Sequence, residues 1–276
     1  ELSEMEKATR ERKRIAGSKG IVDYDWGTAD TLLVPMGGNL FLVTLGTVAP
    51  QVRQLTDNDA FETDANVSPG GRYASFVRDG ALYAIDLDTA EETRLSPAAE
   101  PDKAISYGIA EFVAQEEMSR FTGYWWSRDD KYIAYTRVDE STVDIIPRFD
   151  IAADKVNVIE QRYPRAGRPN AVVDVFVRNM ATGETDEIKW RRDDWGPATD
   201  QYLARVNWLP DAELVVQSVD RDQKTLCRTR FAGPDWSPAP MGAETQPCWI
   251  NLNSDWLPFA PEPRGTHSAQ PLHVLT

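Results

Sequence analysis

A short unit recurs four times along this sequence and limits the fold more than any other feature. Each copy has an apolar residue, a polar turn rich in Pro, Gly or Asp, and then a strand of alternating apolar and polar residues. The apolar anchors are Trp26, Val67, Trp126 and Trp208. The first two lie about 40 residues apart, which matches the roughly 40–45 residues of a four-stranded propeller blade. We therefore expect an all-β fold of the β-propeller class, with insertions in the third and fourth units.

The second unit has the clearest blade pattern. Its strand-forming residues are separated by short turns at Asp79-Gly80 and Asp88-Thr89, and a similar closing hairpin is expected around residues 173–188. A β-sandwich with irregular hairpins is the alternative, because hairpins alone do not specify closure. The recurrence of the whole turn-plus-strand unit favours the propeller.

The overall charge excludes several functions. The 276 residues include 30 Lys and Arg against 44 Asp and Glu, which gives a formal net charge of −14 at pH 7. Such a chain has no surplus of cations with which to bind nucleic acid or an anionic membrane. A hydrophobic content of 41% and a charged content of 27% are typical of globular proteins. We therefore expect no nucleic-acid partner.

Chemistry that depends on histidine or on bound cofactors has little support. His267 and His273 are the only histidines, and both lie in the last ten residues. The sequence has no phosphate-binding Gly-Lys-Ser/Thr loop, no dinucleotide fingerprint and no zinc-ligand spacing. We expect neither a cofactor nor a metal, and no catalytic role for either histidine. Cys227 and Cys248 form one disulfide or remain two free thiols.

The uncharged stretch from residue 31 to residue 52 is the one candidate for a membrane span. Pro35 and the Gly37-Gly38 pair lie at its centre, which a membrane-spanning helix disfavours. Two strands joined by a tight turn fit the stretch better, so no membrane span is expected. The sequence opens at Glu1 without a leader, so we expect a mature form whose leader was removed or a piece of a longer protein.

Composition divides the chain into three parts. Residues 1–20 form a charged, helix-favouring segment, and residues 21–255 hold the repeated units. Residues 256–276 are rich in Pro and lack the alternating pattern of another blade. We hypothesise that the reading frame is disrupted near the start of this irregular tail. Asn66 begins an Asn-Val-Ser triplet, but its place at the start of a turn favours a chance match over glycosylation.

An insertion at about residues 104–123 carries the adjacent pair Glu116 and Glu117. Its residues 110–118 favour a helix, in which neighbouring side chains point about 100° apart. A regular helix would therefore not bring the two carboxylates together, and a solvated surface turn is the plain interpretation. A short or distorted helix would instead aim both carboxylates at one cation, such as a substrate ammonium.

A second insertion, at about residues 143–170, is too apolar for a free loop. Ile145, Phe149, Ile151 and Val156 are among its apolar residues. A two-stranded arm packed on a partner would explain this composition, and packing on the rest of its own domain would explain it equally.

Several segments resemble one known family. AEFVAQEEM at residues 110–118, followed by GYWWSRDDKYIAY at 123–135, resembles the N-terminal β-propeller of dipeptidyl peptidase IV. QRYPRAGRPN at 161–170 is similar to the Tyr-Pro-x-Ala-Gly-x-x-Asn stretch that follows the propeller arm of this family. The opening RERKRI, which begins at Arg10, and the GIVDYD after it are similar to bacterial members and to their cytosolic eukaryotic relatives. The resemblance covers roughly residues 5–255.

The resemblance implies an eight-bladed propeller that caps an α/β-hydrolase domain, with roughly its first half, and an open edge, in this chain. Members of the family are serine exopeptidases that release N-terminal dipeptides with Pro or Ala in second position. Their two motif glutamates, here Glu116 and Glu117, bind the free α-ammonium of the peptide substrate. The family also places an arginine near the substrate carbonyl, and the charged N-terminal helix would supply it. Arg14 is preferred over Arg10 and Arg12, because it lies nearest the end of that helix.

The resemblance further implies that the arm between Val143 and Tyr163 contributes to a homodimer. The nucleophile elbow Gly-Trp-Ser-Tyr-Gly of the family is absent, as is any Gly-x-Ser-x-Gly. We therefore expect no catalytic residue and no α/β-hydrolase domain in this chain, which alone is predicted to be inactive. A periplasmic or secreted product is expected rather than a cytoplasmic one. The alternative function is a non-catalytic β-propeller binding module that keeps the glutamate pair.

Overall fold

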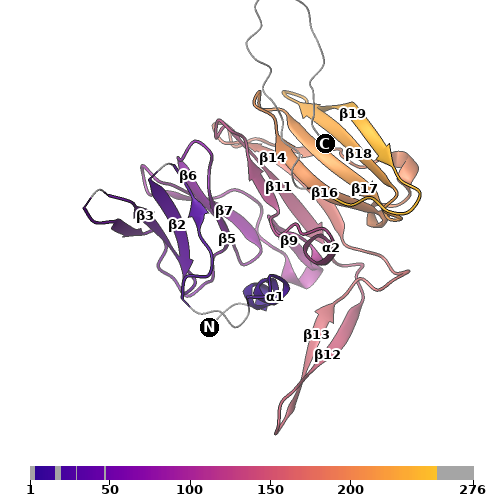
Figure 1. Cartoon of the computed structure of the whole chain (residues 1–276), viewed down its shortest axis with the longest axis horizontal. Coiled ribbons are helices and arrows are strands. Elements are labelled where there is room, and N and C mark those ends of the chain that lie inside the picture. The colour runs from indigo at the N-terminus through magenta and orange to yellow at the C-terminus, as the bar shows by residue number, and fades with distance from the viewer. Residues whose placement is uncertain (1–3, 16–19, 29, 47, 254–276) are drawn as a thin grey trace, which may run out of the picture.

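The computed structural model describes residues 4–15, 20–28, 30–46 and 48–253, and it consists mainly of short antiparallel strands. The strands form four sheets that follow one another along the chain, each with at least four strands (Figure 1). We call these sheets blades 1 to 4. A separate two-stranded arm is inserted into blade 3. The insertion expected in the fourth unit is therefore wrong, because the four strands of blade 4 follow one another directly.

The four blades repeat one antiparallel design. The strands of blades 1 and 2 are, in order, β1 (Asp25–Trp26), β2 (Thr31–Met36), β3 (Asn39–Thr44), β4 (Gln51–Gln54), β5 (Thr63–Val67), β6 (Tyr73–Arg78), β7 (Ala81–Asp86) and β8 (Glu92–Arg94). Blade 3 contains β9 (Ile105–Tyr107), β10 (Tyr124–Trp126), β11 (Tyr132–Asp139), β14 (Val172–Asn179) and β15 (Thr185–Ile188). Blade 4 contains β16 (Gln201–Trp208), β17 (Leu214–Asp220), β18 (Thr225–Ala232) and β19 (Ser237–Thr245). The short β9 is an addition, paired with the end of β11 that β10 leaves free.

Each apolar anchor of the repeated unit closes the first strand of a blade. Trp26 ends β1, Val67 ends β5, Trp126 ends β10 and Trp208 ends β16. This confirms the predicted propeller fold, because the repeated unit marks the start of every blade. The β-sandwich alternative is wrong, since four sheets stand in series instead of two facing each other. Within the described residues the blades do not close into a ring, which agrees with the open edge expected.

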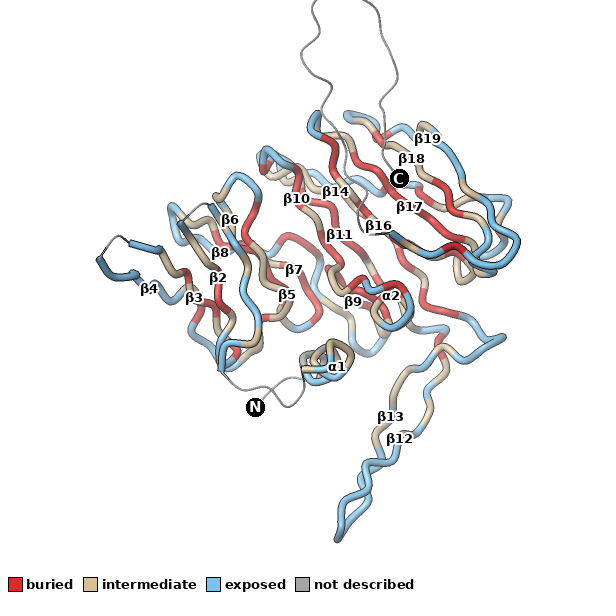
Figure 2. The backbone as a smooth tube through the Cα atoms, viewed as in Figure 1, coloured by how far each residue is buried: buried red, intermediate tan, exposed pale blue. Residues whose placement is uncertain are grey.

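The hydrophobic core lies between neighbouring blades. Tyr73 of blade 2 stacks on Trp126 of blade 3 with 5.1 Å between the ring centroids. The indole N–H of Trp126 donates to the Ser75 hydroxyl at 2.9 Å, so the same ring also carries a polar contact between these blades. Between blades 3 and 4, the indole N–H of Trp208 donates to the carbonyl of Trp125 at 2.9 Å. Buried residues accordingly run along the strands of blades 2, 3 and 4 (Figure 2).

Two α-helices lie beside the blades. α1 (Glu4–Arg12) comes before blade 1, and α2 (Phe112–Glu117) lies in the first insertion, where the sequence favours a helix. The same insertion also supplies β9, a strand of three residues that sequence analysis missed. Three short 3-10 helices complete the described elements: η1 (Pro101–Lys103), η2 (Asp193–Trp195) and η3 (Ala198–Asp200).

The uncharged stretch forms the predicted hairpin from β2 and β3. Gly37 and Gly38 in its turn both have positive φ, a conformation that glycine adopts without the steric penalty of a side chain. No helix in the described ranges is both long enough and apolar enough to cross a membrane.

The second insertion forms an arm from β12 (Ile145–Ile151) and β13 (Val156–Arg162), which projects away from the blades (Figure 1). Phe149 lies opposite Val158 in this hairpin, and most residues of both strands are exposed (Figure 2). The arm is therefore not packed along its own domain, which was one of the two expectations for this segment.

Several residues singled out in the sequence have plain structural roles. Asn66 lies half-buried in β5, and its amide donates to the Tyr124 hydroxyl at 2.8 Å, which leaves little room for a glycan. Cys227 is buried, Cys248 is exposed and both thiols are free. His267 and His273 lie outside the described residues, as does the whole tail after residue 253.

Candidate functional site

The two adjacent glutamates lie at the C-terminal end of α2. The helix packs against blade 4 through Ala114, together with Ala110 just before its start and Met118 just after its end. The spacing of four residues places these side chains on one side of the helix, so their burial sets which side faces the blade. Glu116 and Glu117 belong to the remaining surface and are exposed.

The position of the glutamate pair is electrostatically unfavourable for carboxylates. The C-terminal end of a helix presents backbone carbonyls and a partial negative charge, and the two carboxylates repel each other. The last turn of α2 has no basic residue, and no partner of Glu117 is found in the part of the chain that the structure describes. A cation is therefore the ligand that this end of the helix favours.

Arg12 supplies part of that positive charge from α1. Its Nε lies 3.4 Å from Oε1 of Glu116, and its Nη1 donates to Oε1 of Gln115 at 2.9 Å. The guanidinium also lies over the Phe112 ring, 4.9 Å from the ring centroid. Burial lowers the pKa of Arg12, while the negative charges of Glu116 and Glu140 raise it. Arg12 thus holds one of the two glutamates and leaves the other available.

The other two N-terminal arginines lie elsewhere. Arg10 lines a cavity beside α1. Arg14 is exposed just beyond the end of α1, where its backbone adopts a left-handed conformation with φ 60°. The structure therefore brings Arg12, and not the preferred Arg14, to the glutamate pair. A substrate contact by Arg14 stays a prediction of the sequence.

A buried ion pair lies beneath the helix. Glu111 immediately precedes α2, and Arg120 follows it by a few residues. Nη2 of Arg120 donates to Oε2 of Glu111 at 2.8 Å, and the two side chains are 3% and 6% exposed. Burial raises the pKa of the neighbouring Glu140 carboxyl; the charge of Arg162 lowers it, and that of Glu111 raises it further. Sequence analysis missed this pair, although a glutamate and an arginine on either side of one short helix were a usable signal.

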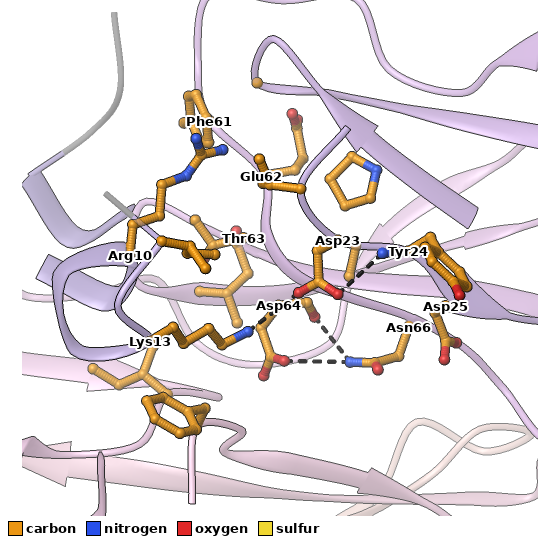
Figure 3. Close-up of a pocket in the computed structure, with 18 of the residues that line it drawn as sticks. Arg10, Lys13, Asp23, Tyr24, Asp25, Phe61, Glu62, Thr63, Asp64 and Asn66 are labelled. Carbon is orange, nitrogen blue, oxygen red and sulfur yellow. Dashed lines mark hydrogen bonds and ion pairs between the residues drawn. The ribbon is translucent and has the colours of Figure 1, made fainter. Parts of the chain in front are cut away.

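A cavity of about 340 Å³ lies next to the site, between α1, the turn of blade 1 and β5 (Figure 3). It reaches α2 at Gln115. Lys13 pairs with Asp23 at 3.2 Å on its wall. Burial raises the pKa of the Asp64 carboxyl to about 6, although the nearby Thr122 hydroxyl and Lys13 ammonium act in the opposite direction. The cavity is thus lined by charges of both signs.

Metal chemistry finds no support in the described residues, where no three His, Cys, Asp or Glu side chains are grouped closely enough to hold an ion. What the site offers is a pair of exposed carboxylates on a short helix, held from one side by a guanidinium. This arrangement suits recognition of a small organic cation such as an ammonium group.

The chain is similar to proteins of one known family. A family model described as the dipeptidyl peptidase IV (DPP IV) N-terminal region matches residues 34–270. The chain is 27% identical over 175 residues to a probable dipeptidyl-aminopeptidase B of Aspergillus terreus; the matched region covers 59% of this chain and 19% of that protein. It is 27% identical over 207 residues to dipeptidyl-aminopeptidase B of Aspergillus niger; the matched region covers 68% of this chain and 22% of that protein. The chain thus spans about a fifth of the length of these relatives.

Two bacterial proteins are among the solved structures that share the fold. Dipeptidyl peptidase 4 of Porphyromonas gingivalis matches with a TM-score of 0.68 at 20% identity, over 83% of this chain and 31% of that chain. A putative dipeptidyl aminopeptidase IV of Bacteroides ovatus matches with a TM-score of 0.64 at 24% identity, over 90% of this chain and 33% of that chain.

Proposed function

The chain belongs to the dipeptidyl peptidase IV N-terminal region family, and we propose that it is the propeller part of a serine exopeptidase that releases X-Pro and X-Ala dipeptides. In this proposal Glu116 and Glu117 bind the α-ammonium of the peptide substrate. The sequence contains no Gly-x-Ser-x-Gly, so the nucleophile, its base and the oxyanion hole would belong to an α/β-hydrolase domain outside it. The names of the curated relatives, dipeptidyl-aminopeptidases, support this class of reaction.

Binding of the amine would decide which peptide bond is cut. An extended chain spans about 3.3–3.6 Å per residue, so an anchored ammonium places the bond two residues along at a fixed distance. A peptide with a blocked amine brings no cation to the glutamates and loses this anchor. A free α-amino group has a pKa of about 7.7–8.0, and neighbouring carboxylates favour its charged form.

The observation that carries the proposal is the exposed glutamate pair at the C-terminal end of α2. Neither the helix end nor the adjacent carboxylates are stabilised by their own segment, so both gain from an incoming ammonium. Arg12 supports the same assignment, because it holds Glu116 from the side of α1. We propose Arg12 as the arginine that approaches the substrate carbonyl.

The proposal is tested by Glu116→Gln and Glu117→Gln in the full-length protein. The substitution keeps the shape of the side chain and removes its charge. Hydrogen bonds to charged groups contribute about 1.5–3 kcal/mol, so each variant should lower kcat/KM for a free-amine X-Pro substrate by roughly 10- to 150-fold. Glu91→Gln is the matched control, because Glu91 is an exposed glutamate in the last turn of blade 2. Unchanged rates in both variants contradict the proposal, and a full-length protein without any hydrolytic activity favours the non-catalytic binding module.

We also infer that the arm contributes to a homodimer. Phe149 and Ile151 of β12 lie opposite Val158 and Val156 of β13, and residues directly opposite in an antiparallel pair share one face. All four side chains are more than half exposed. A contiguous apolar surface of this kind marks an interaction site. The same face on a second copy of the chain would cover it symmetrically.

A further inference from the structure

The helix that carries the glutamate pair is too short to hold its own direction. α2 has six residues, and isolated helices of this length are not stable in water. The directions of Glu116 and Glu117 must therefore be fixed by contacts outside the helix. Packing of Ala114 and Met118 on blade 4 supplies one such contact, but apolar packing alone permits the helix to slide or turn.

Arg120 supplies contacts that are directional. Its side chain is almost fully buried, and its guanidinium donates to three oxygens on three different segments. Nη2 donates to Oε2 of Glu111 at the start of α2, at 2.8 Å. Nη1 donates to the carbonyl of Thr122, on the way into blade 3, at 2.9 Å. Nε donates to the carbonyl of Leu203 in β16 of blade 4, at 3.2 Å. One planar group thus ties the helix to both blades between which it lies.

The backbone of Arg120 holds the other end of α2. Its N–H donates to the carbonyl of Ala114 at 2.9 Å. Between Ala114 and Arg120, Ser119 adopts a left-handed conformation with φ 51°, which is unfavourable for a residue with a side chain. The chain therefore turns sharply just after Glu117, and Arg120 makes the contacts that offset the cost of this turn.

We propose that Arg120 is a positioning residue that directs Glu116 and Glu117 toward one substrate ammonium. The inference rests on the function proposed above. Arg120 does not touch substrate in this account, since Glu111, Thr122 and Leu203 occupy its donors. Lysine cannot replace it, because a single ammonium on a flexible chain does not present donors in the planar fork that reaches three separate oxygens.

The test uses a ratio that is insensitive to loss of folded enzyme. We define the amine discrimination ratio as kcat/KM for an X-Pro substrate with a free α-amine, divided by kcat/KM for the same substrate with that amine replaced by hydrogen. A purely structural defect lowers the amount of active enzyme and reduces both numbers equally. A misdirected glutamate pair reduces only the first.

Arg120→Lys in the full-length protein should lower this ratio at least fivefold, and Arg120→Met combined with Glu111→Gln should lower it further. The double variant removes both members of the buried pair, so no unpaired charge is left behind. Arg78→Lys is the matched control, because Arg78 forms a buried pair with Glu62 at 2.8 Å, and its other contacts, with Glu92, Phe76 and Tyr83, all lie within blade 2. The control should keep the wild-type ratio.

Two results are decisive. A wild-type ratio in Arg120→Lys overturns the inference, provided that Glu116→Gln lowers the ratio. If Glu116→Gln and Glu117→Gln also keep the wild-type ratio, the proposed function itself has failed. As a further check, Arg120→Lys should change the ratio little when Glu116 and Glu117 are already glutamines, because the groups it positions are then gone.

Discussion

Arg12 and Glu116 connect the N-terminal helix to the glutamate pair, with 3.4 Å between Nε of the arginine and Oε1 of the glutamate. The two residues are separated in sequence by the whole of blades 1 and 2. Arg12 is mostly buried by the neighbouring Phe112 ring and the Gln115 amide oxygen. A segment that precedes the first blade therefore forms one wall of the candidate site.

The first prediction concerns which arginine matters. Arg12→Met should lower kcat/KM for a free-amine dipeptidyl substrate by about tenfold, the value of one charge-assisted hydrogen bond. Arg14→Met should change kcat/KM for this substrate by no more than about twofold, because Arg14 faces solvent. Steady-state kinetics of the two variants side by side makes the comparison. The reverse pattern would show that Arg14 is the contacting residue, as the sequence alone suggested.

The second prediction concerns the contact between blades 2 and 3. The buried Asp130 of blade 3 accepts a hydrogen bond from the Ser68 hydroxyl at 2.6 Å and another from the Gly70 N–H at 2.8 Å. Asp130→Ala leaves both donors without this acceptor, so the free energy of unfolding should fall by about 2–4 kcal/mol. Asp88→Asn, in an exposed turn, should change it by less than about 0.5 kcal/mol. Urea unfolding measures the free energy of unfolding of both variants. An Asp130→Ala variant as stable as Asp88→Asn would refute this role of Asp130.

The third prediction concerns pH. Burial raises the pKa of Asp64 to about 6 in the folded protein, above its ordinary value of 3.8. The folded state then binds this proton more tightly than the unfolded state. The stability that it contributes is fully present below about pH 4 and is lost as the pH rises through about 6.

Asp64→Asn removes this titration. The free energy of unfolding of the variant should match that of the wild type near pH 4 and exceed it by about 2–3 kcal/mol at pH 8, because a rise of two pKa units corresponds to that free energy. Asparagine also tolerates the left-handed backbone at this position, where φ is 49°. Urea unfolding between pH 4 and pH 8 gives the difference in free energy of unfolding between the variant and the wild type as a function of pH. A flat curve across pH 6 would contradict the buried, titrating carboxyl.

The fourth prediction concerns the arm. Phe149→Asp combined with Val158→Asp places charges in the centre of its apolar face and should convert a dimer into a monomer. Arg148→Asp, on the opposite face of β12, should leave the dimer intact. Light scattering of the purified full-length protein reports the mass directly. A wild-type protein that is already monomeric at micromolar concentration would dispose of the dimer proposal.

Local patterns predicted much of the fold, and tertiary contacts account for what they missed. Trp126 and Trp208 could be recognised as blade anchors because the turn and the alternating strand that follow them are encoded within about a dozen residues. β9 was missed because three residues are too few to show alternation. The helix around Glu116 was expected, but its packing against blade 4 was not.

In the candidate site, too, local sequence patterns identified some residues, and tertiary contacts determine the others. Glu116 and Glu117 were identified through a resemblance in their own segment, whereas their partners come from elsewhere. The preference for Arg14 was based on its distance along the chain from the end of α1. The turn at that end directs its side chain to solvent and leaves Arg12 facing α2. Ion pairs between distant segments leave no periodic signal in one sequence, so only the folded chain reveals them.

Binding of the substrate ammonium by Glu116 and Glu117 is best measured through the amine discrimination ratio of the full-length wild type and of the variant carrying both Glu116→Gln and Glu117→Gln. The wild type should strongly prefer the free-amine substrate. The double variant should lose most of this preference, while its activity on the substrate without the amine changes little. A double variant that keeps the wild-type ratio would show that the glutamate pair does not bind the substrate ammonium.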